Sequence, residues 1–215
     1  MIISPGRGFI FVHIPKTGGT SLALALEERA MKDDILIGDT PKARRRRGRL
    51  KDLPARGRLW KHARLSDIEG ILSPDEIMGM QIVTITRNPW DRMVSYYHWL
   101  QGQSFSHSAV SRAKTHAFRD FLRHPGTRAE MARDQIDDYL RLSDGRVPSA
   151  LVLRFEDLGA DLARLETALD VRLSLPHANA SDRPDDWATL YDAETRRIVA
   201  ESYAADIRRY GHVAT

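Results

Sequence analysis

The chain of 215 residues contains no cysteine. This absence excludes disulfide bonds, a thiolate nucleophile and cysteine-ligated zinc, and with them several classes of enzyme. It suits a reducing compartment, so we expect a cytoplasmic protein, with a secreted one as the alternative that the lack of cysteine leaves open. The sequence also has no apolar run near the roughly 20 residues of a membrane-spanning helix, and its first residues resemble a strand and not a signal peptide. We therefore expect a soluble protein that has no membrane span.

Acidic residues are nearly missing from one stretch, residues 41–64, which we call the basic segment. It holds 11 Lys or Arg residues against the single acid Asp52, whereas the whole chain carries a net charge of only +4. Gly48, Pro54 and Gly57 interrupt it, which predicts a loop or a short broken helix. Two interpretations stay open. The segment is either a collar that steers an acidic ligand or a solvated surface loop of mutually repelling charges.

Apolar runs and helical patterns alternate along the chain. The predicted strands cover 9–14, 80–86 and 150–155. The predicted helices cover 19–31, 65–72, 89–100, 117–124, 130–142 and 157–169, with one or two more in 187–210. Strands that alternate with helices indicate an α/β fold with a mainly parallel central sheet flanked by helices, here a single domain over 1–215. Ligands of such sheets bind beyond the carboxyl ends of the strands.

A polar turn, Pro-Lys-Thr-Gly-Gly-Thr-Ser, follows the first predicted strand. Gly18 and Gly19 allow the main chain to approach an anion closely, and the next helix begins with N–H groups that point towards it. Lys16 adds a mobile positive charge. Thr20 and Ser21 add hydroxyl donors. The turn is therefore typical of a loop that binds a phosphate-like group.

The turn differs from the loop of nucleotide triphosphatases. That loop ends in Gly-Lys-Ser or Gly-Lys-Thr, whereas here the lysine precedes the glycines, and no predicted strand ends in an acid suited to magnesium. A P-loop kinase or nucleotide hydrolase is thus a disfavoured alternative. A nucleic-acid binder built on the basic segment ranks last, because the segment lacks the interleaved aromatic residues of a single-strand platform. We expect no nucleic-acid partner.

A second polar turn, Arg-Asn-Pro-Trp-Asp-Arg-Met-Val-Ser, follows the strand predicted at 80–86. Asn88 suits the N-cap of a helix, Pro89 its first position, and Asp91 complements the positive end of the helix. The apolar residues that follow have helical spacing and are predicted to form a buried face and not a ligand contact. They are Trp90, Met93, Val94, Tyr97 and Leu100.

Together, these two turns resemble the sulfotransferases that use 3′-phosphoadenosine 5′-phosphosulfate (PAPS), particularly the carbohydrate-modifying branch. The resemblance continues through Leu-Arg-Phe-Glu-Asp-Leu at 153–158, His-Ala-Asn-Ala-Ser at 177–181 and Leu-Tyr-Asp at 190–192. It implies a three-layer, P-loop-like fold. It also implies in-line, metal-independent transfer of a sulfuryl group from PAPS to a hydroxyl of a carbohydrate, glycolipid or small metabolite, which leaves PAP as the product.

The resemblance also assigns residues to the cofactor. The arginine and serine of the second turn, Arg87 and Ser95, would hold the 3′-phosphate. Asn179 is a further candidate for the cofactor pocket. Arg154, Ser181 and Arg183 are weaker candidates, for which structural roles stay open. The first turn would grip the 5′-phosphosulfate through Lys16, Thr17, Gly18, Gly19, Thr20 and Ser21.

Catalysis needs charge stabilisation and a base. Lys16 and the loop amides would stabilise the charge that builds up on the departing phosphate. The acceptor hydroxyl must lose a proton, and members of this branch often use a histidine between the two cofactor motifs. His62 is the only histidine between Lys16 and Arg87, so it is the candidate base, with a merely structural histidine as the competing interpretation. The carboxylates that remain as alternatives are Asp67, Glu69, Asp75 and Glu76.

Two further expectations concern the first histidine and the acceptor. His13 lies within the first predicted strand and is expected to be structural. The acceptor is expected to be a small molecule or a glycan, and an acidic one would suit the basic segment. Its identity would depend on the variable stretches 33–64 and 101–148.

Overall fold

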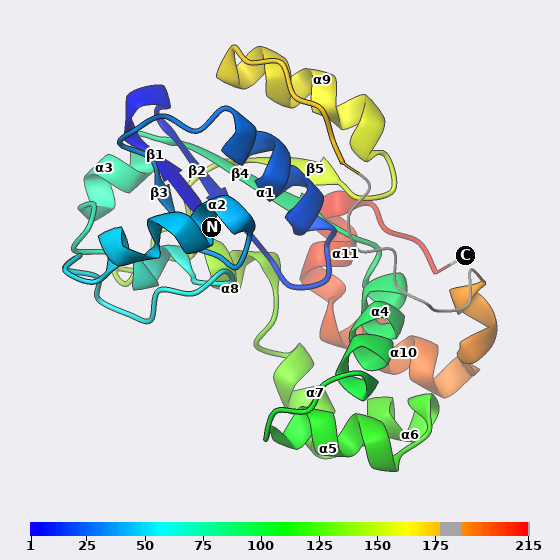
Figure 1. The fold of residues 1–215 in the computed structure, drawn as a ribbon. Helices are drawn as coiled ribbons and strands as arrows, with labels where there is room; N and C mark the ends of the chain where they lie inside the picture. Colours follow the sequence, from blue (N-terminus) through cyan, green and yellow to red (C-terminus); the bar gives the residue numbers. More distant parts are fainter. Residues whose placement is uncertain (177–185, 215) are drawn as a thin grey trace. The chain divides into compact units, whose positions relative to one another are not determined.

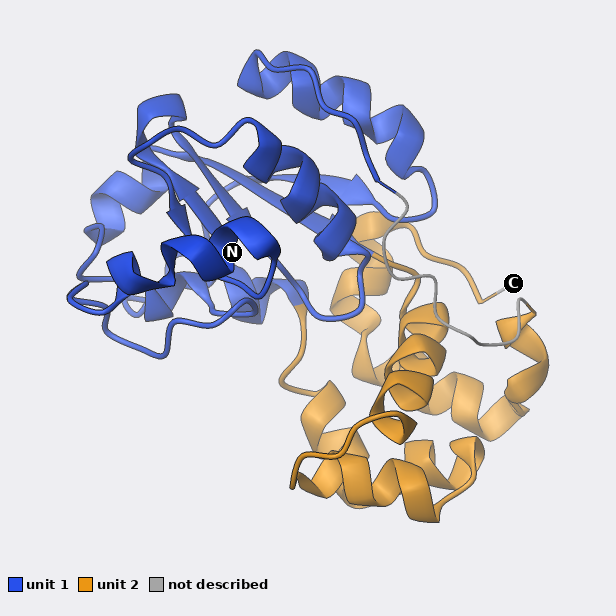
Figure 2. Cartoon of the chain, in the orientation of Figure 1, with its two compact units in different colours: residues 1–86, 136–179 blue, residues 87–135, 180–215 orange. Residues whose placement is uncertain are grey.

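The computed structural model describes residues 1–176 and 186–214. The chain divides into two compact units (Figure 2). Unit 1 comprises residues 1–86 and 136–179, and unit 2 comprises residues 87–135 and 180–215. That the whole chain forms one domain stays a prediction. Among the described residues, none of the helices combines the length and the apolar character that a membrane crossing requires.

Unit 1 is built on a five-stranded sheet with the order β3-β1-β2-β4-β5 (Figure 1). The strands are β1 (Ile2–Ser4), β2 (Phe9–Val12), β3 (Ile35–Leu36), β4 (Gln81–Thr86) and β5 (Ala150–Arg154). Strands β2, β4 and β5 are parallel, with Val12 opposite Thr84 and Thr86 opposite Arg154. Their carboxyl ends therefore meet at one edge, from which both polar turns begin. The predicted α/β class is confirmed.

The antiparallel part of the sheet was not predicted. Strand β1 pairs antiparallel with both β2 and β3, so the parallel strands have an antiparallel extension at one side. Ile2 and Ile3 of β1 are completely or almost completely buried. Strands of two or three residues have no periodicity that distinguishes them from loops, so the sequence pattern could not reveal them.

Helices cover both faces of the sheet in unit 1. Phe9 and Phe11 of β2 pack on one face with Leu22 and Leu165, and alternate residues such as Ile10 are fully buried on the other face. Parallel strands need this double cover, because both of their faces are apolar. The helices of unit 1 are α1 (Gly19–Glu28), α2 (Pro41–Arg46), α3 (Pro74–Met78), α8 (Ile136–Leu140) and α9 (Leu158–Leu169). Its 3-10 turns are η1 (Pro5–Arg7), η2 (Arg47–Leu50) and η3 (Leu65–Asp67).

The basic segment forms the short broken helix that was predicted, as α2 followed by η2. Three of its cations donate to main-chain carbonyl oxygens at and beyond the end of α1. These pairs are Lys42 with Glu27, Arg46 with Met31 (2.7 Å) and Arg49 with Lys32 (2.7 Å). Cations at this position complement the negative end of a helix. Part of the segment therefore has a structural role.

Unit 2 is helical and has its own core (Figure 1). Its helices are α4 (Pro89–Gln101), α5 (Ser108–Thr115), α6 (Phe118–Arg123), α7 (Pro125–Met131), α10 (Ala193–Ser202) and α11 (Ala204–Tyr210), with the 3-10 turn η4 (Trp187–Leu190). The Asn88 side chain accepts a hydrogen bond from Trp90 N at 3.1 Å, so the predicted N-cap is confirmed. The predicted apolar stripe of α4 is buried in this core, which confirms it as well.

Two predicted helices are wrong. The helix predicted at 130–142 is broken, because α7 ends at Met131 in unit 2 and α8 begins at Ile136 in unit 1. The helix predicted at 65–72 is only the 3-10 turn η3. The chain cannot continue as a regular helix beyond this turn because Gly70 adopts φ +95°.

Thr40 supports unit 1 through a buried carboxylate. Its hydroxyl caps α2 by accepting from Ala43 N at 3.2 Å and donates to the Glu27 carboxylate at 2.7 and 2.6 Å. Burial raises the pKa of Glu27 above its usual value, and the Thr40 hydrogen bond opposes that rise. We expect Thr40→Val to lower the free energy of unfolding by about 1 to 3 kcal/mol at pH 7, measured by urea denaturation, because the ionised carboxylate loses its donor.

The sign of the pH dependence follows from the raised pKa. An acid whose pKa is higher in the folded than in the unfolded state destabilises the fold once the pH rises above its unfolded value. The loss caused by Thr40→Val should therefore shrink as the pH falls towards about 4. Thr115→Val is the control, since the Thr115 hydroxyl is exposed and bonds to Ser111 O of its own helix at 2.9 Å. Equal losses in both variants would contradict the role of Glu27.

Candidate active site

The loop between β2 and α1 turns sharply at two left-handed residues. Lys16 has φ 64° and Gly18 has φ 81°. The left-handed region costs a lysine roughly 1 to 2 kcal/mol, so the surrounding structure must hold Lys16 there. Thr17 is buried and its hydroxyl donates to Ile14 O at 3.0 Å. The Thr17 hydroxyl proton is thus used within the loop, and a ligand would meet the main chain of Thr17.

Two aromatic rings pack so closely on the loop that only glycine fits at positions 18 and 19. A Cβ atom at Gly18 would lie 2.5 Å from Cδ2 of Phe155, directly after β5. A Cβ atom at Gly19 would lie 2.4 Å from Cδ2 of the His13 ring. The sequence pattern predicted that glycine at both positions lets an anion approach the main chain. The structure adds a second reason, since the Phe155 and His13 rings leave no room for a Cβ atom. The sequence pattern did not predict these two ring contacts.

Helix α1 begins without a side-chain cap. Its N-cap residue is Gly18, which has no side-chain oxygen to accept from the first amide groups. Ser21 N bonds weakly to Gly18 O at 3.3 Å, and Thr20 and Ser21 are half-buried. The positive end of the helix dipole and the Lys16 ammonium group belong to the same turn. This donor set fits a phosphate or sulfate group.

His62 is fixed against the end of β2. Its Nδ1 lies 2.7 Å from the carbonyl oxygen of His13. A carbonyl oxygen can only accept, so Nδ1 carries the proton of the neutral ring and Nε2 keeps its lone pair. The tautomer of His62 is therefore the one that presents a proton acceptor at Nε2.

A series of rings connects His62 to the loop. The His62 and His13 ring centroids are 4.7 Å apart in an edge-to-face contact, and the His13 ring lies against Gly19. On its other side His62 meets the exposed Trp60 ring at 5.1 Å, and the Arg58 guanidinium lies 5.6 Å from the Trp60 centroid. The structure thus brings the candidate base to the candidate phosphate loop, although His62 and Gly19 are far apart in sequence.

Both histidines are neutral at physiological pH. Burial, reinforced by the Lys61 cation, lowers the pKa of His62 to about 3, although the hydrogen bond to the His13 carbonyl opposes the shift. Burial and the neighbouring His62 also lower the pKa of His13 well below its usual value. His13 is buried, as expected for a structural residue, and it also positions His62 through its carbonyl group.

The alternative carboxylates each have a structural partner. Glu69 is 5% exposed and accepts from Ser143 N at 2.7 Å and from Arg56 at 3.0 Å. Burial opposes its ionisation, but these contacts outweigh burial and lower the pKa of Glu69. The other carboxylates cap a turn, cap a helix or form an ion pair: Asp67 with Arg64 N (2.7 Å), Glu76 with Ser73 N (2.7 Å) and Asp75 with Arg146 (2.9 Å). These contacts favour His62 over the carboxylates as the base.

The second motif opens unit 2. Arg87 is 6% exposed, and its Nε and Nη2 atoms both lie 2.7 Å from Asp91 Oδ2, so Asp91 orients the guanidinium group. Ser95 is also buried. Asn179, Ser181 and Arg183 lie outside the described residues. Arg154 forms an ion pair with Asp157 at 3.4 Å, which supports its structural interpretation.

Comparison with known proteins adds a family and a fold. A family description, "Sulfotransferase family", matches residues 1–212. No curated protein matches the chain. Among solved structures the chain is similar to mouse sulfotransferase SULT7A1 complexed with PAP, with 16% sequence identity, a TM-score of 0.55, and coverage of 95% of this chain and 86% of that one. At this identity the likeness concerns the fold, and it confirms the expected P-loop-like arrangement.

The packing at Gly18 can be tested by adding one methyl group. We expect Gly18→Ala to destabilise unit 1 by about 1 to 3 kcal/mol, because the new Cβ clashes with Phe155 and the left-handed backbone is strained. Thermal unfolding monitored by circular dichroism measures this loss. Gly159→Ala on α9 is the matched control, since a Cβ there meets nothing within 4 Å. A Gly18→Ala variant as stable as this control would contradict the packing account.

Proposed function

We propose that this chain, which belongs to the sulfotransferase family, transfers a sulfuryl group from PAPS to a hydroxyl of a carbohydrate, glycolipid or small metabolite. One observation carries the proposal. A donor-rich loop that begins a helix lies beside a neutral histidine whose Nε2 can accept a proton, and the His13 ring holds the two together. Transfer from an anionic donor to a hydroxyl needs these two functions side by side.

The loop residues fit the phosphosulfate end of PAPS. Gly18 and Gly19 let an anion approach the loop main chain closely, and Lys16, Thr20 and Ser21 add a charge and hydroxyl donors. We assign Arg87 and Ser95 to the 3′-phosphate, as the family resemblance implies. A guanidinium group has five N–H donors, so the pairing of Arg87 with Asp91 is compatible with a second anion. The bound cofactor supplies the activated sulfuryl group.

Lys16 and the loop amides act on the leaving group. These fixed donors would stabilise the negative charge that the phosphate leaving group acquires, without having to reorganise. Each well-placed donor contributes roughly 3 to 4 kcal/mol to such stabilisation. The left-handed conformation of Lys16 directs the main chain into this turn.

The Lys16 side chain is proposed to act on the charge that develops during transfer. Lys16→Ala should therefore impair turnover more than it impairs retention of the cofactor.

His62 accepts the proton of the acceptor hydroxyl at Nε2. The hydrogen bond from Nδ1 to the His13 carbonyl maintains the tautomer and favours the imidazolium ion that forms. Burial makes the isolated imidazole a weak base, with a pKa of about 3. An anionic donor bound at the loop would raise that pKa by charge attraction and so would make His62 a stronger base.

The pH profile tests the role of His62. We expect His62→Gln to lower kcat by about 10²-fold or more in a PAPS turnover assay, with little change in PAP affinity. The base must be neutral to act and is neutral above its pKa. In the unmodified enzyme, kcat/KM for PAPS reports the donor-free enzyme and should therefore stay flat from pH 8 to about 5, without a fall near 6.5. His116→Gln is the control for an exposed histidine. An unchanged kcat in His62→Gln would return the role to a carboxylate.

One thermal-shift experiment separates the candidate functions. PAP should raise the midpoint of unfolding, whereas ATP with magnesium and a single-stranded oligonucleotide should raise it much less, because only a ligand that binds the folded state stabilises it. Stabilisation by ATP alone would favour a kinase or nucleotide hydrolase. Stabilisation by the oligonucleotide alone would favour a nucleic-acid binder. Mass spectrometry of acceptor mixtures incubated with PAPS would then identify the acceptor.

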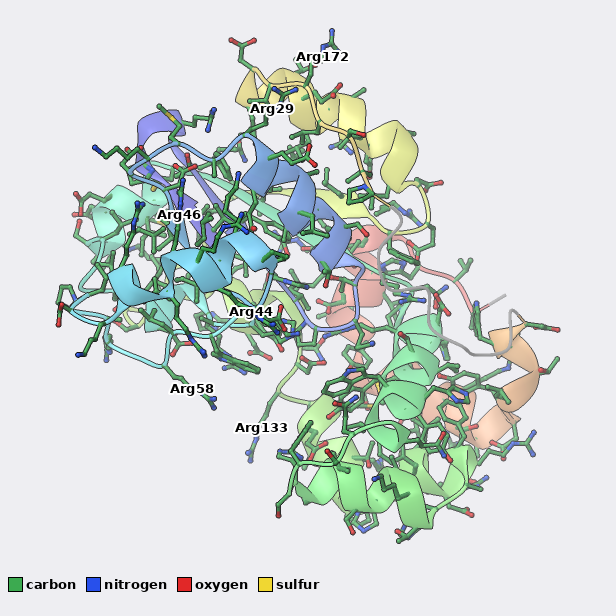
Figure 3. The ribbon with its side chains drawn as sticks, viewed as in Figure 1. Arg29, Arg44, Arg46, Arg58, Arg133 and Arg172 are labelled. Carbon is green, nitrogen blue, oxygen red and sulfur yellow. The ribbon has the colours of Figure 1, made fainter. Side chains whose placement is uncertain are left out.

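The exposed cations of the basic segment support the proposal that the acceptor is acidic. Arg44, Arg45 and Arg47 are exposed, whereas Arg46 donates to the carbonyl oxygens of Met31 and Asp34. Figure 3 shows Arg44 and Arg46 leaving α2 in different directions. An exposed cluster of like charge attracts an anionic ligand over a distance of about one Debye length.

The two sets of arginines should respond differently to substitution. Replacing Arg44, Arg45 and Arg47 with Gln should leave the unfolding midpoint unchanged and reduce the salt dependence of KM for an acidic acceptor. Arg46→Gln is the matched comparison. It should lower the midpoint, because the carbonyl groups beyond α1 lose their donor. If the triple variant keeps the full salt dependence, the segment is a solvated surface and not a collar.

A further inference from the structure

Unit 1 contains a cavity whose lining does not include the residues proposed for sulfuryl transfer. Its volume is about 390 Å³, within the range of small-molecule sites. Two stretches of chain form it, residues 56–67 and 138–143. Its polar lining includes Arg56, Arg64, Ser66, Asp138, Arg141 and Ser143.

The wall of the cavity is held in place by buried contacts. Arg56 N donates to Glu69 O at 2.7 Å and Gly57 N donates to Asp67 O at 2.9 Å, so the two sides of the first stretch are paired. The buried Glu69 carboxylate joins this pair to the second stretch by accepting from Ser143 N at 2.7 Å. A Cβ atom at Gly57 would lie 2.0 Å from Asp67 Oδ1. The cavity is therefore preformed.

The lining combines cationic, anionic and hydroxyl groups. Arg64 and Arg141 contribute guanidinium groups, Asp67 and Asp138 contribute carboxylates, and Ser66 contributes a hydroxyl group, whereas the Ser143 hydroxyl donates to the Glu69 carboxylate. Glu69 neutralises the charge of Arg56 at 3.0 Å. A ligand with several hydroxyl groups suits such a lining, because each hydroxyl both donates and accepts. A compact anion suits it less, since Asp138 would repel it.

The cavity is continuous in sequence with the candidate base. Arg64 and Ser66 follow His62 along the same stretch of chain, and Arg64 lies over the Tyr139 ring at 5.5 Å, which joins this stretch to α8. We propose that the cavity binds a sugar ring of a carbohydrate acceptor. The inference rests on the proposed function, since it names the part of the chain that would recognise the acceptor.

Binding of simple glycosides tests the cavity without sulfuryl transfer. The probes are the methyl glycosides of glucose, galactose and N-acetylglucosamine, observed by saturation-transfer NMR. At least one should bind the unmodified chain, and Asp138→Asn and Arg141→Ala should each weaken it by about tenfold or more, because a hydrogen bond to a charged group is lost. Arg172→Ala is the matched control in unit 1, since the Arg172 side chain is 88% exposed beside α9 (Figure 3).

The outcomes distinguish this inference from the proposed function. Glycoside binding that is unchanged in both cavity variants, or absent for all three probes in the unmodified chain, overturns the inference. Binding of inorganic phosphate in place of the glycosides also overturns it, in favour of an anion site. Normal PAP stabilisation in the cavity variants shows that they are folded and that their defect concerns the acceptor. If PAP does not raise the unfolding midpoint of the unmodified chain, the proposed function is contradicted, and glycoside binding stands as a separate result.

Discussion

The hydrogen bond from His62 Nδ1 to the His13 carbonyl is the contact on which the site depends. It satisfies a buried carbonyl group at the end of β2, which would cost about 1 to 3 kcal/mol if left without a donor. It also sets the tautomer of His62 and holds the last part of the basic segment beside the loop. The His13 ring then packs on Gly19, so one residue links the strand, the loop and the candidate base.

Helix α1 connects the loop to the basic segment. Its N-cap residue, Gly18, has no side chain that could cap the first turn, while cations of the basic segment donate to carbonyl groups at and beyond its other end. The negative end of the helix is therefore satisfied within the protein, and the positive end remains suited to an anion. The same segment leaves other arginines exposed, so a single stretch of sequence combines stabilisation of α1 with an electropositive surface.

The two compact units divide the two candidate cofactor motifs between them. Unit 1 contains the loop after β2 and His62, and unit 2 begins with Arg87 and contains Ser95. Each unit has an apolar core of its own. In unit 2, helix α4 serves both purposes, because its apolar stripe forms the core while Asp91 in its first turn orients Arg87. The positions of Arg87 and Ser95, the candidate residues for the 3′-phosphate, therefore depend on how this helix packs.

The sequence by itself determined the strand–turn–helix units, the buried stripe of α4, the glycine-containing loop, the broken helix of the basic segment and the sulfotransferase resemblance. These features depend on periodicity, capping and turn chemistry, which act between residues a few positions apart. Only the tertiary structure decided the antiparallel strands β1 and β3, the break between α7 and α8, the packing of Phe155 and His13 on the glycines, and which arginines stay exposed. Each of these is decided by contacts between segments distant in sequence or by the division of the chain into units, and no local pattern of residues encodes them.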